Sequence, residues 1–272
     1  MKKKQSYTTI LLFVIFFAGL SLLLYPSISN YLNSMHQSKA VASYVERAQD
    51  LSKEERASYF EQAHAYNASL LERVDSFYLS ESQRKVYENT LDITGTGIMG
   101  YVEIPTLDVT LPIYHGTEDS ILQVAVGHLD WSSLPVGGMD THCVISGHRG
   151  LPSAKLFTHI DQLVEGDRFM LRVLNTTLTY EVDQILIVEP KDLQPLEIVR
   201  GQDYCTLVTC TPYGINSHRL LVRGHCVENE EPSNRVVAEV VAIDKTIVAF
   251  VISIPLLVVF LLFVLFRRRG EK

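Results

Sequence analysis

TLVTCTPYGINSHRLLVRG occupies residues 206–224, and this stretch predicts a β-hairpin. A β-branched run ends at Cys210, a Pro-Tyr-Gly turn follows, and a second apolar run begins at Arg219. Apolar, β-branched runs on both sides of a turn of this composition are typical of two antiparallel strands. Cys210 and Arg219 stand on opposite arms of the hairpin, so their side chains can meet across it.

The surrounding chain, from residue 95 to residue 227, has the pattern of an all-β domain. Short apolar runs alternate with clusters of Gly, Pro, Asn and Asp. The expected strands cover residues 98–104, 109–114, 143–146, 169–173, 180–188, 206–209 and 219–222. A short helical turn is expected near residues 154–163. Many short strands with frequent turns indicate a closed barrel or a sandwich, so the fold class is mainly β.

Residues 30–94 form a helical region that precedes the β domain. There is no Gly or Pro between Asn30 and Thr94. Residues 52–55 read SKEE, which predicts a capping box at the start of a helix. Apolar residues then recur at steps of three and four, as on one face of a helix: Tyr59, Phe60, Ala63, Tyr66, Leu70 and Leu71. Two interpretations are open, a stalk that raises the β domain and a cover that packs on it.

Two long apolar runs give the 272-residue chain a mean hydropathy of +0.11 despite 20% charged residues. Residues 8–24 and 246–266 each match the thickness of a bilayer core. Lys residues precede the first run and Arg residues follow the second, which predicts that both termini are cytoplasmic and the middle is outside. Residues 1–29 are expected to be a membrane anchor, with a cleaved signal peptide as the alternative. Residues 228–245 read as a linker, 246–266 as a transmembrane helix and 267–272 as a cytoplasmic tail.

The middle of the chain is strongly acidic once the two ends are set aside. Seven of the 24 Lys and Arg residues, but only one of the 31 Asp and Glu residues, lie in the ends. The middle therefore has 17 basic and 30 acidic residues and a net charge of −13. This charge argues against binding to nucleic acid or to anionic lipid, and solubility is its more common explanation. The composition also excludes intrinsic disorder and a multi-span transporter, and it disfavours a cytosolic enzyme.

Three side chains could carry nucleophilic chemistry together. His148 lies in the sequence SGHRG just after an expected strand, and Cys210 and Arg219 lie in the hairpin. A thiolate attacks, an imidazole protonates the leaving amine, and a guanidinium favours the thiolate or stabilises an oxyanion. Each residue also has an ordinary structural interpretation: a buried thiol, a surface histidine, or an ion pair of Arg219 or Arg223. Three other imidazoles compete with His148, namely those of His115, His128 and His218.

The remaining cysteines are expected to lie away from these three side chains. Cys143 and Cys205 stand five residues before His148 and Cys210, and Cys226 stands seven after Arg219. Odd offsets along strands put residues on opposite faces. We therefore predict that the three are core thiols or a structural pair, not redox regulators of Cys210. Four cysteines without a CxxC motif give little support to a zinc site.

At these residues the sequence resembles the sortase family. TLVTC matches the TLxTC signature of that family, and SGHRG before it and the Arg nine residues after the Cys complete the pattern. Longer stretches are similar to class C sortases, the pilin-polymerising branch: MGYVEIP at 99–105, SLPVGG at 133–138, GHRGLPSAKLF at 147–157 and TCTPYGINSHRLLVRG at 209–224. The resemblance extends over about residues 60 to 266.

The resemblance implies a cysteine transpeptidase with an eight-stranded β-barrel, on the outer face of a Gram-positive membrane. Cys210 would attack the Thr carbonyl of an LPxTG-like sorting signal and form a thioacyl enzyme. His148 would be the general acid and then the base, and Arg219 would hold the substrate or the oxyanion. A lysine of another pilin subunit would resolve the intermediate as an isopeptide bond. No metal or organic cofactor is implied.

One departure from the class C pattern concerns the lid that those enzymes place over the cysteine. Their Asp-Pro-aromatic motif corresponds here to Asp75-Ser76-Phe77, so the Pro is replaced. Without the fixed φ angle of proline the segment is less pre-organised. We therefore expect a lid that is looser, or one that does not plug the site.

Three other functions remain as alternatives. A sortase that anchors proteins to peptidoglycan would use the same three residues with a different amine. An inactive, membrane-tethered binding or scaffold domain would not need them. Papain-like proteolysis is a weaker rival, because the C-G-S-C-W-type context of that family is missing.

Overall fold

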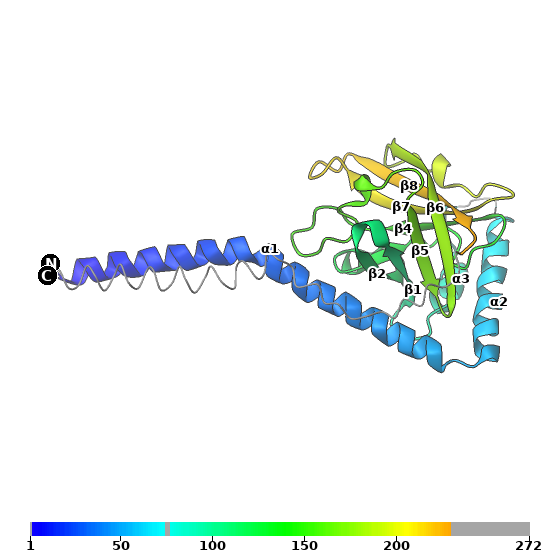
Figure 1. Cartoon of the computed structure of the whole chain (residues 1–272), viewed down its shortest axis with the longest axis horizontal. Helices are drawn as coiled ribbons and strands as arrows, with labels where there is room; N and C mark the ends of the chain where they lie inside the picture. Colours follow the sequence, from blue (N-terminus) through cyan, green and yellow to red (C-terminus); the bar gives the residue numbers. More distant parts are fainter. Residues whose placement is uncertain (1, 74–76, 230–272) are drawn as a thin grey trace. The chain divides into compact units, whose positions relative to one another are not determined.

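The computed structural model describes residues 2–73 and 77–229 of the chain. Figure 1 labels most of its helices and strands. The helices are α1 (Lys2–Asp50), α2 (Lys53–Leu70), α3 (Glu81–Asn89) and α4 (Asp119–Leu122), with 3-10 turns η1 (Pro105–Leu107), η2 (Ile160–Gln162) and η3 (Gln194–Leu196). The strands are β1 (Ile98–Ile104), β2 (Val109–His115), β3 (Val126–His128), β4 (Thr141–Ser146), β5 (Arg168–Val173), β6 (Thr176–Val188), β7 (Asp203–Thr211) and β8 (His218–Val227).

The eight strands form a closed barrel in the order β1-β2-β3-β4-β7-β8-β6-β5, which β1 closes by pairing with β5. The pairs β2/β3 and β4/β7 are parallel and the other neighbours are antiparallel. A closed barrel leaves no sheet edge exposed. The predicted mainly-β barrel is thus confirmed.

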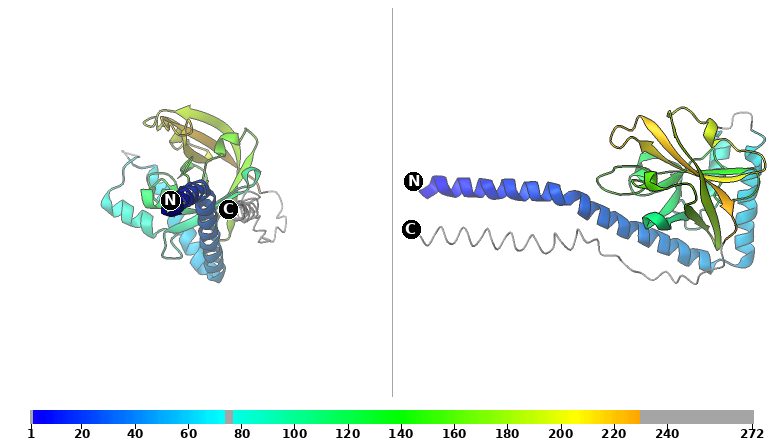
Figure 2. Two further views of the ribbon diagram at one scale, coloured as in Figure 1. Left: turned by 90° about the vertical axis from the view of Figure 1, so that its left-hand side faces the viewer. Right: turned by 45° about the horizontal axis from the view of Figure 1, so that its top comes forward.

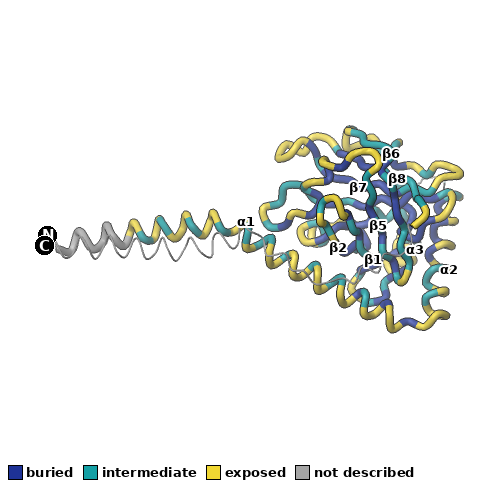
Figure 3. Tube along the Cα trace, in the orientation of Figure 1, coloured by how far each residue is buried: buried dark blue, intermediate teal, exposed yellow. Residues whose placement is uncertain are grey.

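Side-chain alternation gives the sheet two apolar faces. In β5 the predicted alternation is present, with Phe169, Leu171 and Val173 fully buried in the barrel interior. Figure 3 shows the buried parts of the chain in dark blue. A second cluster lies on the opposite face of the sheet and consists of Val144, Val208, Leu221 and Leu196. Leu196 belongs to the β6–β7 connection, which therefore covers part of the outer face of β4, β7 and β8.

Helices α2 and α3 begin with capping boxes and pack on the barrel. Ser52 and Glu55 form the predicted box at α2, and Ser80 and Gln83 form another at α3. On α2, Ala63, Tyr66 and Leu70 join the same buried cluster as the barrel interior. Figures 1 and 2 show α2 running alongside the barrel in each view. Helix α2 therefore packs on the barrel, which favours the cover interpretation for this helix.

Helix α1 contributes to two compact units of the chain. In the first unit, residues such as Leu12, Leu22 and Leu23 are highly exposed, and the helix is apolar and long enough to cross a membrane. In the second unit, which begins at Leu32, the hydroxyl of Tyr44 donates to Met99 O (2.9 Å) and accepts from Leu174 N–H (2.9 Å). The end of α1 is thus bonded to the barrel.

The sequence-based strand list differs from the structure in one missing strand and in several strand ends. The three-residue strand β3 was not predicted, β6 begins at Thr176 rather than 180, and β7 and β8 extend beyond the predicted runs. The predicted helical turn near 154–163 is the 3-10 turn η2. The second apolar run, the tail and most of the linker lie outside the described residues.

Candidate active site

The β7–β8 hairpin places Cys210 directly opposite Arg219, as predicted. Directly opposed residues of antiparallel strands share a face, with Cβ atoms about 5 Å apart. Both side chains are half-buried. The Arg219 guanidinium donates through Nη1 to Asn216 O (3.3 Å) and His218 O (3.1 Å), which are carbonyls at the end of the same hairpin. The guanidinium is therefore held on the side of the hairpin next to Cys210.

His148 reaches the other side of Cys210 from the neighbouring strand. Strands β4 and β7 are parallel, and their register ends with Ser146 beside Val208. It continues beyond the strand, because Gly147 N–H donates to Val208 O (3.0 Å) and the Thr209 hydroxyl donates to Gly147 O (2.7 Å). The next position therefore brings the backbone of His148, just beyond the end of β4, beside Cys210.

Gly147 makes this approach possible. A Cβ atom at this position would lie 2.7 Å from a ring carbon of Phe157. Real Cβ atoms do not come so close to other atoms, so a larger residue would push the loop off the Phe157 ring. The three predicted side chains thus sit on three adjacent strands or at their ends, with Cys210 in the middle.

The three competing histidines have other roles. His115 is buried, and its ring nitrogens bind Gly97 O (2.9 Å) and Thr90 O (2.8 Å). Burial lowers the pKa of His115. His128 is fully buried beneath α3. His218 is exposed, pairs with Thr211 rather than Cys210, and contacts Ser217. His148 is therefore the imidazole that the fold best associates with Cys210.

The other cysteines lie on the opposite face, as their spacing predicts. Cys143 and Cys205 are buried in the barrel interior, and Cys226 packs against the same cluster. Val208, two residues before Cys210, belongs instead to the outer cluster. Burial raises the pKa of Cys205, and it raises the pKa of Cys226 to about 11. These two groups are therefore neutral thiols at ordinary pH.

A groove of about 190 Å³ opens on the outer face of the sheet, and Arg219 is the candidate site residue that lines it. Its floor is formed by Ser146, Val208, Leu221 and Arg219. The first wall comes from the β2–β4 region and is lined by Thr117, Leu122 and Leu129. The second wall comes from the end of β6 and the β6–β7 connection and is lined by Val188, Glu189, Pro190, Asp192, Leu193 and Leu196. The groove is lined mostly by apolar residues and includes Arg219.

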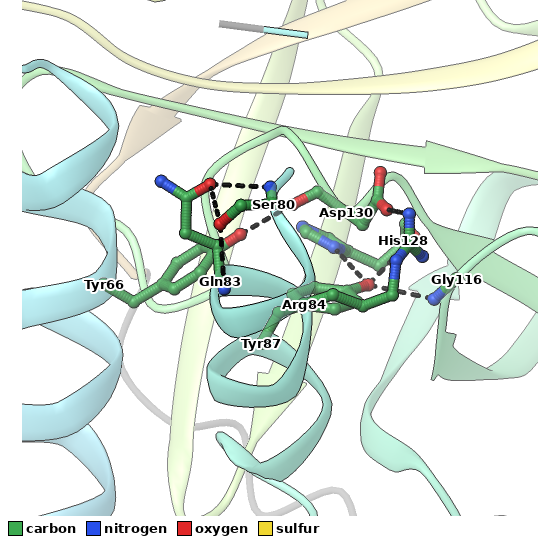
Figure 4. A network of polar contacts seen from close by, with 8 residues as sticks. All are labelled: Tyr66, Ser80, Gln83, Arg84, Tyr87, Gly116, His128 and Asp130. Atoms are coloured by element: carbon green, nitrogen blue, oxygen red, sulfur yellow. Dashed lines mark hydrogen bonds and ion pairs between the residues drawn. The ribbon is translucent and has the colours of Figure 1, made fainter. Parts of the chain in front are cut away.

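The first wall is anchored by a buried network around Tyr87 of α3, shown in Figure 4. The Tyr87 hydroxyl accepts from Gly116 N–H (2.9 Å) and lies 3.0 Å from both Nδ1 and the carbonyl oxygen of His128. His128 Nε2 in turn donates to Ser133 O (2.8 Å). Gly116 and His128 directly precede the groove residues Thr117 and Leu129, so one hydroxyl fixes two segments of this wall.

We expect a Tyr87→Phe variant to weaken this wall. It leaves the buried Gly116 N–H without its acceptor, which costs about 1–3 kcal/mol of stability. The KM for a sorting-signal peptide should rise about threefold or more, with a smaller change in kcat. A Tyr180→Phe variant is the matched control, because Tyr180 is equally buried but donates to Asp203 at the opposite end of β7. Equal KM values in the two variants would contradict the role of Tyr87.

The second wall is held by His142 of β4. This residue is buried, its Nδ1–H donates to Glu197 O (2.9 Å), and its Nε2 accepts from the Thr206 hydroxyl (2.7 Å). It therefore fastens the end of the β6–β7 connection to the sheet. Burial lowers the pKa of His142 to about 4, so its imidazole is neutral at pH 7.

Of the two predicted lid residues, Asp75 lies outside the described residues. The Phe77 ring packs edge-on against Trp131, with ring centroids 5.0 Å apart. Trp131 belongs to the β3–β4 connection and packs against the outer cluster. The effect of this segment on access to Cys210 stays a prediction.

Together, the barrel, the hairpin and the groove define a protein with a candidate cysteine nucleophile at the end of a closed eight-stranded sheet. Comparison with known proteins identifies the family. A family model described as Sortase domain matches residues 102–227. The chain belongs to the sortase family, as its sequence motifs predict.

Several solved structures of class C sortases are similar over most of the chain. Sortase C1 of Streptococcus agalactiae is 46% identical, with a TM-score of 0.69; the match covers 71% of this chain and 100% of that one. Sortase C of Streptococcus pneumoniae is 43% identical, with a TM-score of 0.65 and coverages of 71% and 99%. Clostridium perfringens sortase C, solved with the C-terminal cell wall sorting motif, is 40% identical, with a TM-score of 0.63 and coverages of 71% and 100%.

Curated relatives match a shorter part of the chain. Sortase D of Bacillus subtilis is 31% identical over 114 residues, which is 42% of this chain and 54% of that protein. Sortase A of Streptococcus agalactiae is 27% identical over 117 residues, 42% of this chain and 47% of that protein. The chain thus spans about half the length of the curated relatives it matches.

Proposed function

We propose that the protein is a membrane-anchored cysteine transpeptidase that cleaves an LPxTG-like sorting signal and joins pilin subunits through isopeptide bonds. The observation that carries the proposal is the position of Cys210, opposite Arg219 on β8 and beside His148 at the end of β4. These are the nucleophile, charge stabiliser and proton donor that acyl transfer requires.

The reaction follows from this arrangement in two halves. The Cys210 thiolate attacks the Thr carbonyl carbon, and the oxyanion that forms is stabilised by the Arg219 guanidinium. The imidazolium of His148 protonates the departing Gly nitrogen as the Thr–Gly bond breaks, which leaves a Cys210 thioester. A lysine amine then attacks the thioester, neutral His148 accepts its proton, and the thiolate leaves as the isopeptide bond forms.

One feature supports a pilin substrate over a cell-wall acceptor, and a second supports a sorting-signal substrate for either acceptor. The similar solved structures are class C sortases, and the structure of the Streptococcus pneumoniae enzyme gives insight into its pilin substrate specificity. The Clostridium perfringens enzyme was solved with a sorting motif, in line with the mostly apolar groove that includes Arg219 here. Attachment to peptidoglycan shares the first half of the reaction and differs only in the amine.

The first part of α1 supports a membrane location. Its apolar, exposed side chains fit lipid, and the three Lys residues with which it begins fit the cytoplasmic side. The acidic middle of the chain would then be extracytoplasmic. This location would keep the site close to membrane-bound pilin precursors.

A Cys210→Ala variant tests the proposal. Cells that carry only this variant should lose high-molecular-weight pilin ladders completely, because no thioacyl intermediate can form. The purified full chain in detergent should trap a pilin fragment on the wild-type protein by mass spectrometry and none on the variant. Ladders that persist in the variant cells would contradict the catalytic role. Wild-type product that contains a peptidoglycan amine instead of a pilin lysine would favour wall anchoring.

A further inference from the structure

The residues on both sides of His148 are bonded to the residues on both sides of Cys210. Before His148, Gly147 O accepts from the Thr209 hydroxyl (2.7 Å). After His148, the Arg149 guanidinium donates through Nη1 to the Thr211 hydroxyl (3.3 Å). The imidazole and the thiol thus each occupy the middle of a three-residue segment, and the two segments are joined at both ends.

Arg149 is itself held from three directions. Its side chain is only 11% exposed, and Nη2 makes a 2.5 Å ion pair with Asp161 of η2. Its Cζ atom lies 6.0 Å from the centre of the Tyr213 ring in the β7–β8 turn. The same ring leaves no room for a Cβ at Gly150, where one would lie 2.8 Å away. Arg149 therefore bridges the His148 loop, the η2 segment and the hairpin of Cys210.

Stability alone gives little reason for this arrangement. The Asp161 side chain is 39% exposed, but the guanidinium is largely buried, and burying a charged group costs desolvation that its attraction to a partner often does not recover. The Nε of Arg149 is also buried and has no hydrogen-bond partner among the described residues. A buried, incompletely satisfied guanidinium between the two reactive segments suggests a functional demand on this position.

We propose that Arg149 is a positioning residue, which holds the His148 imidazole beside the Cys210 thiol through Thr211 and Asp161. This inference rests on the proposed function. Asp161 compensates the charge of Arg149, so the role proposed for Arg149 is to fix the distance between His148 and Cys210. Arg219 differs, because its proposed role is to face the reacting carbonyl. Misplacement of a catalytic group by about 1 Å can cost about 100-fold in rate.

An arginine is needed for this geometry. The planar fork of a guanidinium can bind Asp161 and Thr211 at once through different nitrogens. A lysine ammonium is a point charge, so it would keep the ion pair with Asp161 but not the fork that also reaches Thr211. Lysine should therefore restore only part of the function.

The test uses the purified full chain in detergent with a sorting-signal peptide, and rates are normalised to the folded fraction. For Arg149→Met we expect kcat to fall about 30- to 100-fold with KM within about twofold of wild type. Arg149→Lys should recover part of kcat, and Thr211→Val should lose about threefold. Arg223→Met is the matched control, because Arg223 pairs with Asp183 and stacks on Tyr204 but lies four residues beyond Arg219 on β8. The control should keep its kcat within about twofold.

The outcomes separate this inference from the function on which it rests. If Cys210→Ala is inactive and Arg149→Met keeps its kcat, the positioning role is wrong while the proposed function stands. A rise in KM with unchanged kcat, or equal losses in Arg149→Met and Arg223→Met, would also overturn it. If Cys210→Ala remains active, the proposed function itself fails.

Discussion

Replacing Arg219 by lysine should lower kcat/KM for a sorting-signal peptide by about 100- to 1000-fold, the usual effect of removing a group that stabilises an oxyanion. Nη1 of Arg219 donates to the carbonyls of Asn216 and His218, so these two bonds fix the orientation of the other guanidinium nitrogens. A lysine ammonium cannot bind these carbonyls and a substrate oxygen with the same geometry. Steady-state kinetics of the purified full chain would measure the effect.

The division of this loss between kcat and KM shows what Arg219 contacts. A fall in kcat alone indicates contact with the oxyanion, whereas a rise in KM alone indicates contact with the bound substrate. Arg223→Lys is the control, because Arg223 extends from the same face of β8 and pairs with Asp183. A kcat/KM of Arg219→Lys within threefold of the wild-type value would exclude a direct role for Arg219.

A His142→Gln variant should lose much of the acid sensitivity of the fold. The pKa of His142 is about 4 in the folded protein, against about 6.5 when unfolded. Between these values the unfolded chain binds a proton that the folded chain does not, so stability falls as the pH falls from about 6.5 to about 4. The full loss is roughly 3 kcal/mol, of which about 2 kcal/mol is reached at pH 5.

Glutamine can retain both bonds of His142, since its amide N–H can donate to Glu197 O and its oxygen can accept from Thr206. We therefore expect the drop in unfolding free energy between pH 7 and pH 5 to be about 2 kcal/mol smaller in the variant. Trp131, the only tryptophan of the chain, lines a pocket together with His142 and reports urea unfolding by fluorescence. His218→Gln, at an exposed position, should leave the pH dependence as in the wild type. If the pH dependence of His142→Gln equals that of the wild type, the lowered pKa of His142 does not cause the acid sensitivity.

The local parts of the fold and site could be predicted from the sequence. The hairpin that opposes Cys210 and Arg219 depends on a turn of a few residues, and the faces of the cysteines depend only on strand alternation. The capping box at Ser52 and the apolar face of α2 likewise follow from local spacing. Short-range patterns of this kind are properties of the segment itself.

The long-range parts could not be predicted in this way. Strand β3 is three residues long and contains Gly127, where a Cβ would collide with Gly116 O, so it lacks the pattern of a strand. The spacing of the four histidines along the sequence does not show which imidazole lies near Cys210. Only the parallel pairing of β4 with β7 identifies His148 as that residue. The roles of Tyr87 and His142 depend on partners far along the chain.

The separations within the candidate site also bear on the order in which a newly made chain assembles it. Cys210 and Arg219 are nine residues apart and meet when one hairpin closes, whereas the bonds that bring up His148 join residues 62 positions apart. Contacts between distant residues form later, because they carry a larger loop-closure cost. We therefore expect a half-folded chain to expose a thiol without its proton donor. If the proposed function holds, reactivity would appear only once the barrel is complete, which would spare neighbouring proteins from premature acyl transfer.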